Sequence, residues 1–221
     1  SFAGYTNEKV CLHGYVKYID DTENLVKEVH KYNGECKFII SLRSPVERAY
    51  SGYWEGKKTA RLESNSFYDE VVSRKDLNGE LHINSSSLCI SDSFYSKKIK
   101  KLLGIVKIEN VKFINYHQLL NDPKKTVSEV FAFLDVDNTF EPNMVKSNES
   151  GVARSYFIQK LFQKLKAPIF LKKYLSGSLL SNIKTFLIRK VNVKRAQYPK
   201  MDTELKVALD EYFKQELDEI K

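Results

Sequence analysis

The chain has 221 residues, of which 42% are hydrophobic and 12% aromatic, enough to bury one substantial core, so we expect a single domain over residues 1–221. No run of about 18 apolar residues occurs, and the first ten residues lack the basic and apolar regions of a signal peptide. These absences exclude a membrane-spanning class and predict a cytoplasmic location. The three cysteines are widely spaced and odd in number, which predicts free thiols rather than a disulfide framework or a zinc site.

The net charge of +8 is unevenly distributed along the chain. Residues 151–200 contain twelve Lys or Arg and no Asp or Glu, whereas the remainder has 24 basic and 28 acidic residues. A segment without acids forms either a solvated helical surface or a face for an anionic partner, such as a nucleotide, an acidic glycan, nucleic acid or lipid headgroups. Apolar residues among its lysines are compatible with peripheral membrane contact, and equally with a packed pair of amphipathic helices.

The first half of the chain predicts a helix, a strand and a second helix. Asp21 and Thr22 can cap a short helix that Asn33-Gly34 stops. The sequence CKFIISL, residues 36–42, is a continuous apolar run typical of a strand buried on both faces. Pro45 suits the first position of the next helix, because its ring fixes φ at a helical value.

The second half continues the alternation of helices and strands. We expect helices over residues 95–103, 123–136 and 202–217, a buried strand over 111–116, and helical stretches between 157 and 187. Helices that alternate with at least two buried strands indicate a layered α/β fold with a parallel sheet.

The stretch LRSPVERAYSGYW, residues 42–54, places an arginine at the end of the first strand. Ligands of open parallel sheets bind beyond the carboxyl ends of the strands. Ser51 lies about 9 Å along the helix axis from Pro45, so Arg43 and Ser51 can converge on one phosphate through charge-assisted hydrogen bonds and a hydroxyl donor. Alternatively, Arg43 pairs with a nearby carboxylate and Ser51 bonds to the carbonyl four residues earlier.

This stretch resembles the 3′-phosphate-binding motif of sulfotransferases that use 3′-phosphoadenosine 5′-phosphosulfate (PAPS). In that family an arginine ends a strand and a serine follows eight residues later, as Arg43 and Ser51 do, and the family's Arg-Ala-Tyr-Ser core is intact at residues 48–51. The resemblance implies a three-layer α/β fold, with a central parallel sheet flanked by helices as in P-loop nucleotide kinases. It also implies that Arg43 and Ser51 bind the 3′-phosphate.

Further matches follow in the family's order from about Val10 to Ile220. Residues 111–137 resemble the second strand, Asp-Pro turn and helix of the family, with Asp135 in place of a glycine. Residues 147–161 resemble the Asn-x-Ser-Gly segment of bacterial carbohydrate-type members, and residues 198–220 resemble their Tyr-Pro-x-Met stretch and final helix.

The resemblance also assigns part of the basic segment. In heparan-type members a Lys-Gly-Arg loop before Tyr-Pro wraps the cofactor. Counted back from Tyr198-Pro199, Lys194 matches the family lysine, and Arg195 substitutes for the displaced arginine. The resemblance therefore implies that Lys194 and Arg195 contact the cofactor; as an alternative they are solvated charges on a loop.

Two departures from the family pattern concern the reacting end of the cofactor. The family's 5′-phosphosulfate loop, a Lys-x-Gly-Thr-Thr-like turn, is expected upstream of Ser1, so a sulfotransferase domain trimmed of its first strand and loop is the simplest expectation. The nearest imitation, LSGSLLS at residues 175–181, has no buried strand before it. His13 occupies a family glutamate position and could be a general base, but we expect a structural or solvent-facing histidine and leave the catalytic residue unassigned.

The sequence thus predicts sulfuryl transfer from PAPS to a hydroxyl or amine, with 3′-phosphoadenosine 5′-phosphate as product and no metal. The resemblance favours a carbohydrate or glycolipid acceptor over nucleic acid, leaves small alcohols open, and says nothing of oligomeric state. The alternative is a non-catalytic module that binds a nucleotide, nucleic acid or acidic glycan through residues 151–200. A nucleotide kinase is disfavoured, since no G-x-x-x-x-G-K-[ST] signature occurs.

Overall fold

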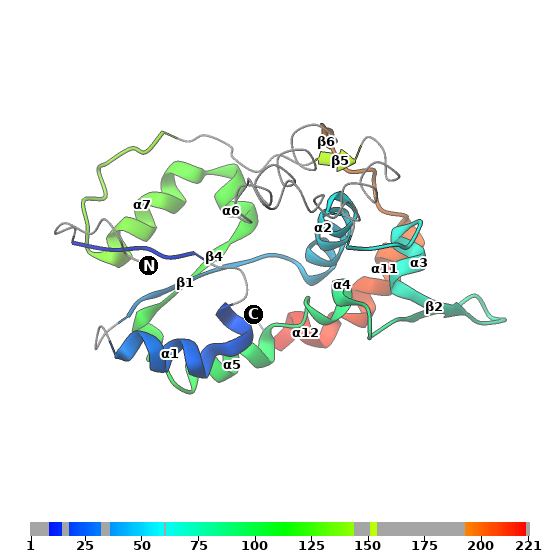
Figure 1. Cartoon of the computed structure of the whole chain (residues 1–221), viewed down its shortest axis with the longest axis horizontal. Helices are drawn as coiled ribbons and strands as arrows, with labels where there is room; N and C mark the ends of the chain where they lie inside the picture. The colour runs from blue at the N-terminus through cyan, green and yellow to red at the C-terminus, as the bar shows by residue number, and fades with distance from the viewer. Residues whose placement is uncertain are drawn as a thin grey trace, which may run out of the picture. The chain divides into compact units, whose positions relative to one another are not determined.

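The computed structural model describes residues 9–14, 18–31, 36–59, 61–143, 151–153 and 193–219 (Figure 1). The chain divides into two compact units. The first comprises Ser1–Ser44, Phe94–Val145 and Glu216–Lys221, and the second Pro45–Ser93 and Lys146–Gln215. The expected single domain over residues 1–221 stays a prediction.

A pair of parallel strands forms the centre of the first unit. Strand β1 (Phe38–Leu42) pairs with β4 (Val111–Asn115), in a register that runs from Phe38 opposite Val111 to Leu42 opposite Asn115. Helices α1 (Thr22–His30) and α5 (Ser96–Leu103) supply core residues that pack against these strands. The core and its partly buried neighbours comprise Val26, Leu102, Val106, Val111, Phe38, Ile40 and Phe113.

The other side of the strand pair carries the helices that follow β4. Helix α6 (Tyr116–Asn121) begins directly after the strand, and α7 (Pro123–Leu134) follows it. Figure 1 shows α7 across the strands from α1 and α5. The first unit is therefore an α/β layered structure with a parallel sheet flanked by helices, which confirms the predicted fold class.

Two details of the first unit differ from the prediction. Strand β1 is half-buried, with Ser41 exposed, instead of buried on both faces. Strand β4, predicted as a buried strand over residues 111–116, is likewise buried only at Val111 and ends at Asn115. Among the described residues β1 pairs with β4 alone, and so small a sheet leaves its strands partly uncovered. Asp21 precedes α1, but its carboxylate makes no capping bond and instead accepts from the side-chain nitrogen of Asn24 at 3.0 Å, because a 3₁₀ turn, Tyr18–Asp21, leads into the helix.

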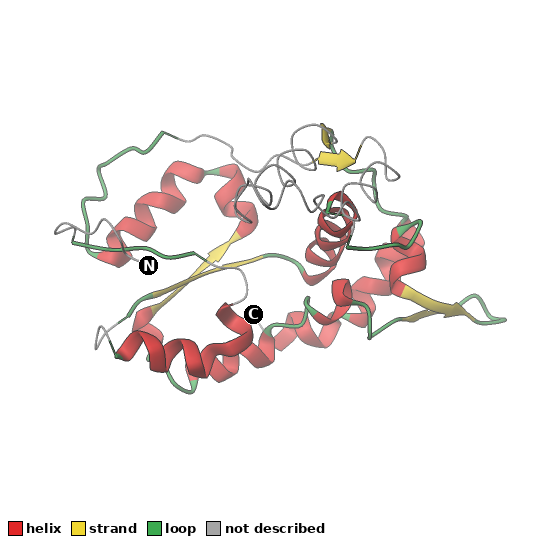
Figure 2. Cartoon of the chain, in the orientation of Figure 1, coloured by secondary structure: helices red, strands yellow, loops and turns green. Residues whose placement is uncertain are grey.

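The second unit is mainly helical and carries two short antiparallel strand pairs (Figure 2). Its elements are α2 (Pro45–Lys58), α3 (Phe67–Val71), β2 (Val72–Lys75), β3 (Leu81–Ile83), α4 (Leu88–Ser91), β5 (Gly151–Ala153), β6 (Val193–Arg195) and α11 (Thr203–Tyr212). Strand β2 pairs with β3, and β5 with β6. The core joins α2, α3, α4 and α11 through Val46, Ala49, Tyr53, Phe67, Val71, Cys89, Ile90, Leu205, Leu209 and Phe213.

The helix predicted over residues 202–217 is interrupted. Helix α11 ends at Tyr212, and α12 (Lys214–Glu219) begins after Phe213. Leu205, Leu209 and Phe213 are buried, whereas Tyr212 is 37% exposed. None of the helices in the described ranges has the length and apolar character needed to cross a membrane.

Candidate functional site

Arg43 directly follows β1, at the carboxyl end of the strand pair. Its guanidinium carbon lies 4.7 Å from the centroid of the Tyr116 ring. Tyr116 opens α6 directly after β4, and the parallel register pairs Leu42 with Asn115, so both residues leave adjacent strand ends on the same edge. The sheet thereby places a cation on an aromatic face where parallel sheets bind ligands.

The backbone of Arg43 is held by a second tyrosine of the first unit. The hydroxyl of Tyr95, a residue only 7% exposed, donates to the Arg43 carbonyl oxygen. The backbone N–H of Tyr95 in turn donates to the Glu216 carboxylate at 2.7 Å. Glu216 also accepts from the backbone N–H and the hydroxyl of Ser96, at 2.6 and 2.7 Å. This buried carboxylate fixes the start of α5 and, with it, the place of Tyr95.

Ser51 lies on α2 in the second unit and is half-buried. Within the described ranges its hydroxyl makes no hydrogen bond, so the alternative bond to the carbonyl four residues earlier is not formed. The chain passes from the first unit to the second between Ser44 and Pro45. The convergence of Arg43 and Ser51 on one phosphate therefore stays a prediction.

The rest of the Arg-Ala-Tyr-Ser core serves the packing of the second unit. Arg48 forms an ion pair with Asp92 at 3.5 Å. The hydroxyl of Tyr50 donates to the Pro199 carbonyl at 2.6 Å. The rings of Trp54 and Tyr198 stack, with centroids 5.4 Å apart and planes 10° from parallel. These contacts fasten the Tyr-Pro segment onto α2, which gives a structural reason for two motifs that are distant in the sequence.

Lys194 and Arg195 belong to β6, where they pair with Val152 and Gly151 of β5. Strand β5 lies beside α2, the helix that carries Ser51. The fold of the second unit therefore pairs the backbone of both basic residues with a strand that lies beside α2. Their side chains lie outside the described part of the structure, so their contact with a cofactor stays a prediction.

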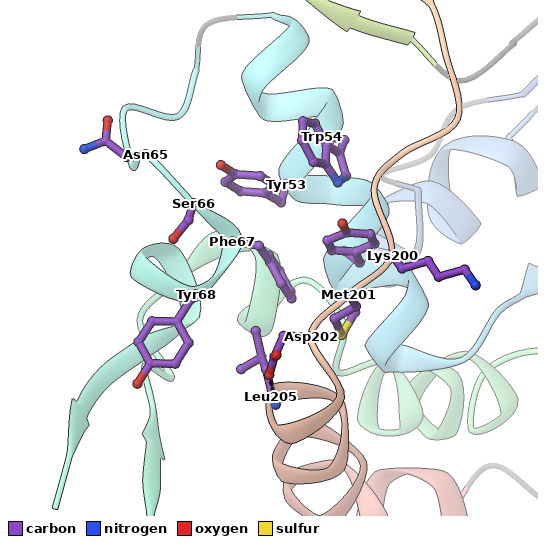
Figure 3. A pocket seen from close by; sticks show the side chains of 11 residues that line it. Tyr53, Trp54, Asn65, Ser66, Phe67, Tyr68, Lys200, Met201, Asp202 and Leu205 are labelled. Carbon is purple, nitrogen blue, oxygen red and sulfur yellow. Dashed lines mark hydrogen bonds between the residues drawn. The ribbon is translucent and has the colours of Figure 1, made fainter.

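A pocket of about 290 Å³ lies on the α2 side of the second unit (Figure 3). Its polar edge is already engaged, because Ser66 accepts from the Asp69 N–H and Asp202 from the Leu205 N–H, both at 3.0 Å. Figure 3 shows the Lys200 side chain extending away from the rings. An aromatic pocket that contains a carboxylate suits a ring-shaped group better than a phosphate. It is lined by Tyr50, Tyr53, Trp54, Asn65, Ser66, Phe67, Tyr68, Lys200, Met201, Asp202 and Leu205.

The structure says less about the other residues singled out in the sequence, which are His13, the LSGSLLS stretch, the basic segment and the cysteines. His13 is exposed, in the loop of residues 9–14. Among the described residues no group of three or more His, Cys, Asp or Glu side chains is placed to hold a metal ion. The LSGSLLS stretch and most of the basic segment lie outside the described residues. Of the cysteines, Cys11 is exposed, Cys36 is half-buried and Cys89 is buried, and all three thiols are free.

Three residues around Arg43 were missed in the sequence: Tyr95, Tyr116 and Glu216. Tyr116 was accessible to prediction, because it follows β4 as Arg43 follows β1, and the ends of parallel strands meet at one edge. Tyr95 is 52 residues from Arg43, and Glu216 is 120 residues from Ser96. Local sequence patterns carry no signal for such pairs.

Comparison with known proteins agrees with this fold. The profile of the sulfotransferase domain family matches residues 21–221. The crystal structure of a sulfotransferase from Alicyclobacillus acidocaldarius superposes with a TM-score of 0.53 at 20% identity, covering 85% of this chain and 68% of that one. At this identity the likeness shows a shared fold.

Two curated relatives match part of the chain. Heparan sulfate glucosamine 3-O-sulfotransferase 5 of Mus musculus and that of Homo sapiens are each 24% identical to it over 115 residues, which is 52% of this chain. The chain spans about a third of the length of these relatives, since the match covers 33% of each. The family match, which extends over nearly the whole chain, and the shared α/β fold lead to one conclusion: this chain belongs to the sulfotransferase domain family.

Proposed function

We propose that the protein transfers a sulfuryl group from PAPS to a hydroxyl or amine of a carbohydrate or glycolipid. The observation that carries this proposal is the place of Arg43 at the carboxyl end of β1, with Ser51 on the helix that follows. This is the edge at which open parallel sheets bind ligands. Membership of the sulfotransferase domain family supports the same chemistry.

In this proposal Arg43 and Ser51 hold the 3′-phosphate of the nucleotide. A guanidinium forms paired charge-assisted bonds to phosphate oxygens. The Ser51 hydroxyl, which has no hydrogen bond within the described ranges, supplies a further donor. Lys194 and Arg195, on the strand next to β5, are assigned additional contacts with the cofactor.

The 3′-phosphate is remote from the bonds that change in the reaction. Its binding energy therefore orients the donor without taking part in the chemical step. PAPS supplies the activated sulfuryl group, and 3′-phosphoadenosine 5′-phosphate is the product. The protein's own contribution at this end is to fix the position of the nucleotide relative to the acceptor.

The proposed acceptor class rests on the curated relatives. Their name describes transfer to a glucosamine hydroxyl of heparan sulfate, which favours a sugar acceptor for this chain. The proposal includes a cytoplasmic site of action. If the acceptor is a glycolipid, it also includes peripheral contact of the basic segment, residues 151–200, with a membrane. No nucleic-acid partner is proposed.

The test is a calorimetric titration of the chain with 3′-phosphoadenosine 5′-phosphate and, in parallel, with 5′-AMP. Removing one partner of a hydrogen-bonded charge pair costs about 2–5 kcal/mol, or at least about 30-fold in affinity. We therefore expect the 3′-phosphorylated nucleotide to bind at least about 30-fold more tightly than 5′-AMP, and Arg43→Ala to abolish this preference.

A matched control is Arg74→Ala, because Arg74 is an exposed arginine of β2. This variant should keep the preference for the 3′-phosphorylated nucleotide. Equal binding of both nucleotides, with an affinity that falls steeply as salt rises, would instead favour the anion-binding module.

A further inference from the structure

We propose that the aromatic pocket of the second unit binds an uncharged sugar ring and so holds part of the acceptor glycan. The inference deepens the proposed function and rests on it for the role of the sugar, because a carbohydrate acceptor is part of that proposal. The pocket has a volume of about 290 Å³, near the lower end of the range of ligand pockets, which suits a single ring. Its lining residues all belong to the second unit.

Four of the lining rings contact one another and give the pocket an apolar surface. The centroid of the Phe67 ring lies 4.9 Å from that of Tyr50 and 5.5 Å from that of Tyr53. The centroid of the Trp54 ring lies 5.3 Å from that of Tyr53 and 6.1 Å from that of Tyr50. Such a surface can pack against the C–H groups of a sugar ring and leave the hydroxyls of the sugar for polar partners.

Trp54 also brings a polar group that the chain does not satisfy. Its indole N–H is a buried donor, and it has no hydrogen-bond acceptor among the described residues. A buried donor without an acceptor is costly, and native proteins rarely keep one without a reason. An oxygen of a bound sugar supplies the acceptor once the indole turns slightly, since side chains around the nitrogen enclose it.

The rim of the pocket offers partners of the opposite kind. Asp202 uses its Oδ1 oxygen to cap α11, at 3.0 Å from the Leu205 nitrogen, and its Oδ2 oxygen makes no hydrogen bond with the described residues. The exposed side-chain amide of Asn65 makes none with them either. A carboxylate oxygen accepts from a hydroxyl, and an amide both donates and accepts.

Charge decides between a neutral ring and a charged one. Besides the Asp202 carboxylate in the lining, Asp69 and Glu70 lie close enough to Tyr53 for their charges to raise the pKa of its hydroxyl. The Lys200 side chain extends away from the rings (Figure 3). These carboxylates disfavour an anionic ligand, and an ammonium ligand cannot accept from the indole N–H. An uncharged ring with hydroxyl groups serves both the donor and the carboxylate.

The test uses the fluorescence of Trp54, which reports on this pocket because it is the only tryptophan of the chain. The chain is titrated with methyl β-D-glucopyranoside and, in parallel, with methyl β-D-glucuronide, which has the same ring and a carboxylate. We expect a saturable change with the neutral glycoside, with a dissociation constant of about 1–10 mM for so small a ligand. The glucuronide should bind at least about fivefold more weakly.

Two variants assign this selectivity to the rim. Asp202→Asn keeps the helix cap, because asparagine caps as well as aspartate, and should bring the affinities of the two glycosides to within about twofold. Asn65→Ala should weaken the neutral glycoside about two- to fivefold. Asn78→Ala, at an exposed asparagine between β2 and β3, is the matched control and should leave both affinities unchanged.

Saturation-transfer NMR with the same glycosides detects binding that leaves the fluorescence unchanged. Absence of binding by both methods, or equal affinity of the wild type for the two glycosides, would overturn the inference. A selectivity that persists in Asp202→Asn would also overturn it, since the carboxylate is then not its cause.

The glycoside titrations contain no nucleotide, so their outcome is separate from that of the proposed function. Glycoside binding by a chain that has no preference for the 3′-phosphorylated nucleotide overturns the proposed function and leaves the sugar-binding pocket in place. A preference for that nucleotide without glycoside binding overturns this inference alone.

Discussion

Two ionisable residues in the core of the second unit illustrate how burial acts on single side chains. Burial raises the pKa of the Cys89 thiol from 9.0 to about 11, and the nearby Glu70 carboxylate adds to the effect. The pKa of the Tyr53 hydroxyl is likewise raised, from 10.0 to about 12. Burial is the main cause, and the negative charges of Asp69 and Glu70 raise it further. Both groups are therefore neutral in the folded protein at pH 7.

These shifts predict a loss of stability in alkali. The folded chain keeps both protons to higher pH than the unfolded chain, so the free energy of unfolding falls as pH rises from about 9 towards 12. Cys89→Ala should make this fall shallower between about pH 9 and 11, whatever its cost at neutral pH. The measurement is urea unfolding across this range. The wild-type chain is the reference, and equal slopes for Cys89→Ala and the wild type would contradict the prediction.

At the scale of elements, the end of α7 shows a departure from the family pattern. Asp135 occupies the position where the family has glycine, and it adopts a left-handed backbone with φ 59°. Its N–H donates to the Ala132 carbonyl at 3.1 Å, which closes the helix. Its carboxylate lies 3.1 Å from the Lys9 ammonium, but both side chains are exposed, so this ion pair contributes little.

Substitution of Asp135 should therefore report on its backbone conformation. Asp135→Gly should raise the free energy of unfolding by about 0.5 kcal/mol, because glycine adopts the left-handed region without a Cβ penalty. Asp135→Ala should lower it by a similar amount, since alanine visits this region less readily than aspartate. Thermal or urea unfolding of the two variants decides the matter: a similar loss of stability in both would show that the carboxylate, which both variants lack, and not the backbone determines stability here.

The elements also show which local signals a sequence carries. Helices α2 and α7 begin where predicted, because Pro45 and the pair Asp122-Pro123 act on the backbone beside them; Asp122 accepts from the Lys125 N–H at 3.1 Å. The β2–β3 hairpin was not predicted, because its strands are short and largely polar. Its turn, Asp76-Leu-Asn-Gly, nevertheless has residue types that favour turns, and the Asp76 carboxylate accepts from the backbone N–H groups of Asn78 and Glu80.

At the scale of the whole molecule, the alternation of helices and apolar runs was sufficient to predict a layered α/β fold with a parallel sheet, and the resemblance to the sulfotransferase family implied the helices on both of its faces. The half-burial of β1 was not predictable, because it depends on what covers the strand. Arg43 could be predicted as a ligand-binding candidate from the sequence, because it directly follows one apolar strand and this position depends on local sequence alone. Tyr95 and Glu216 could not, since they reach this region through tertiary contacts alone.

The central claim is that Arg43 and Ser51 together bind the 3′-phosphate, and a crystal structure with 3′-phosphoadenosine 5′-phosphate tests it most directly. We predict 3′-phosphate oxygens within about 3 Å of the Arg43 guanidinium and of the Ser51 hydroxyl, with the guanidinium still over Tyr116. A nucleotide bound elsewhere, with its 3′-phosphate on the basic residues between 151 and 200 and none of its oxygens near Arg43, would contradict the claim.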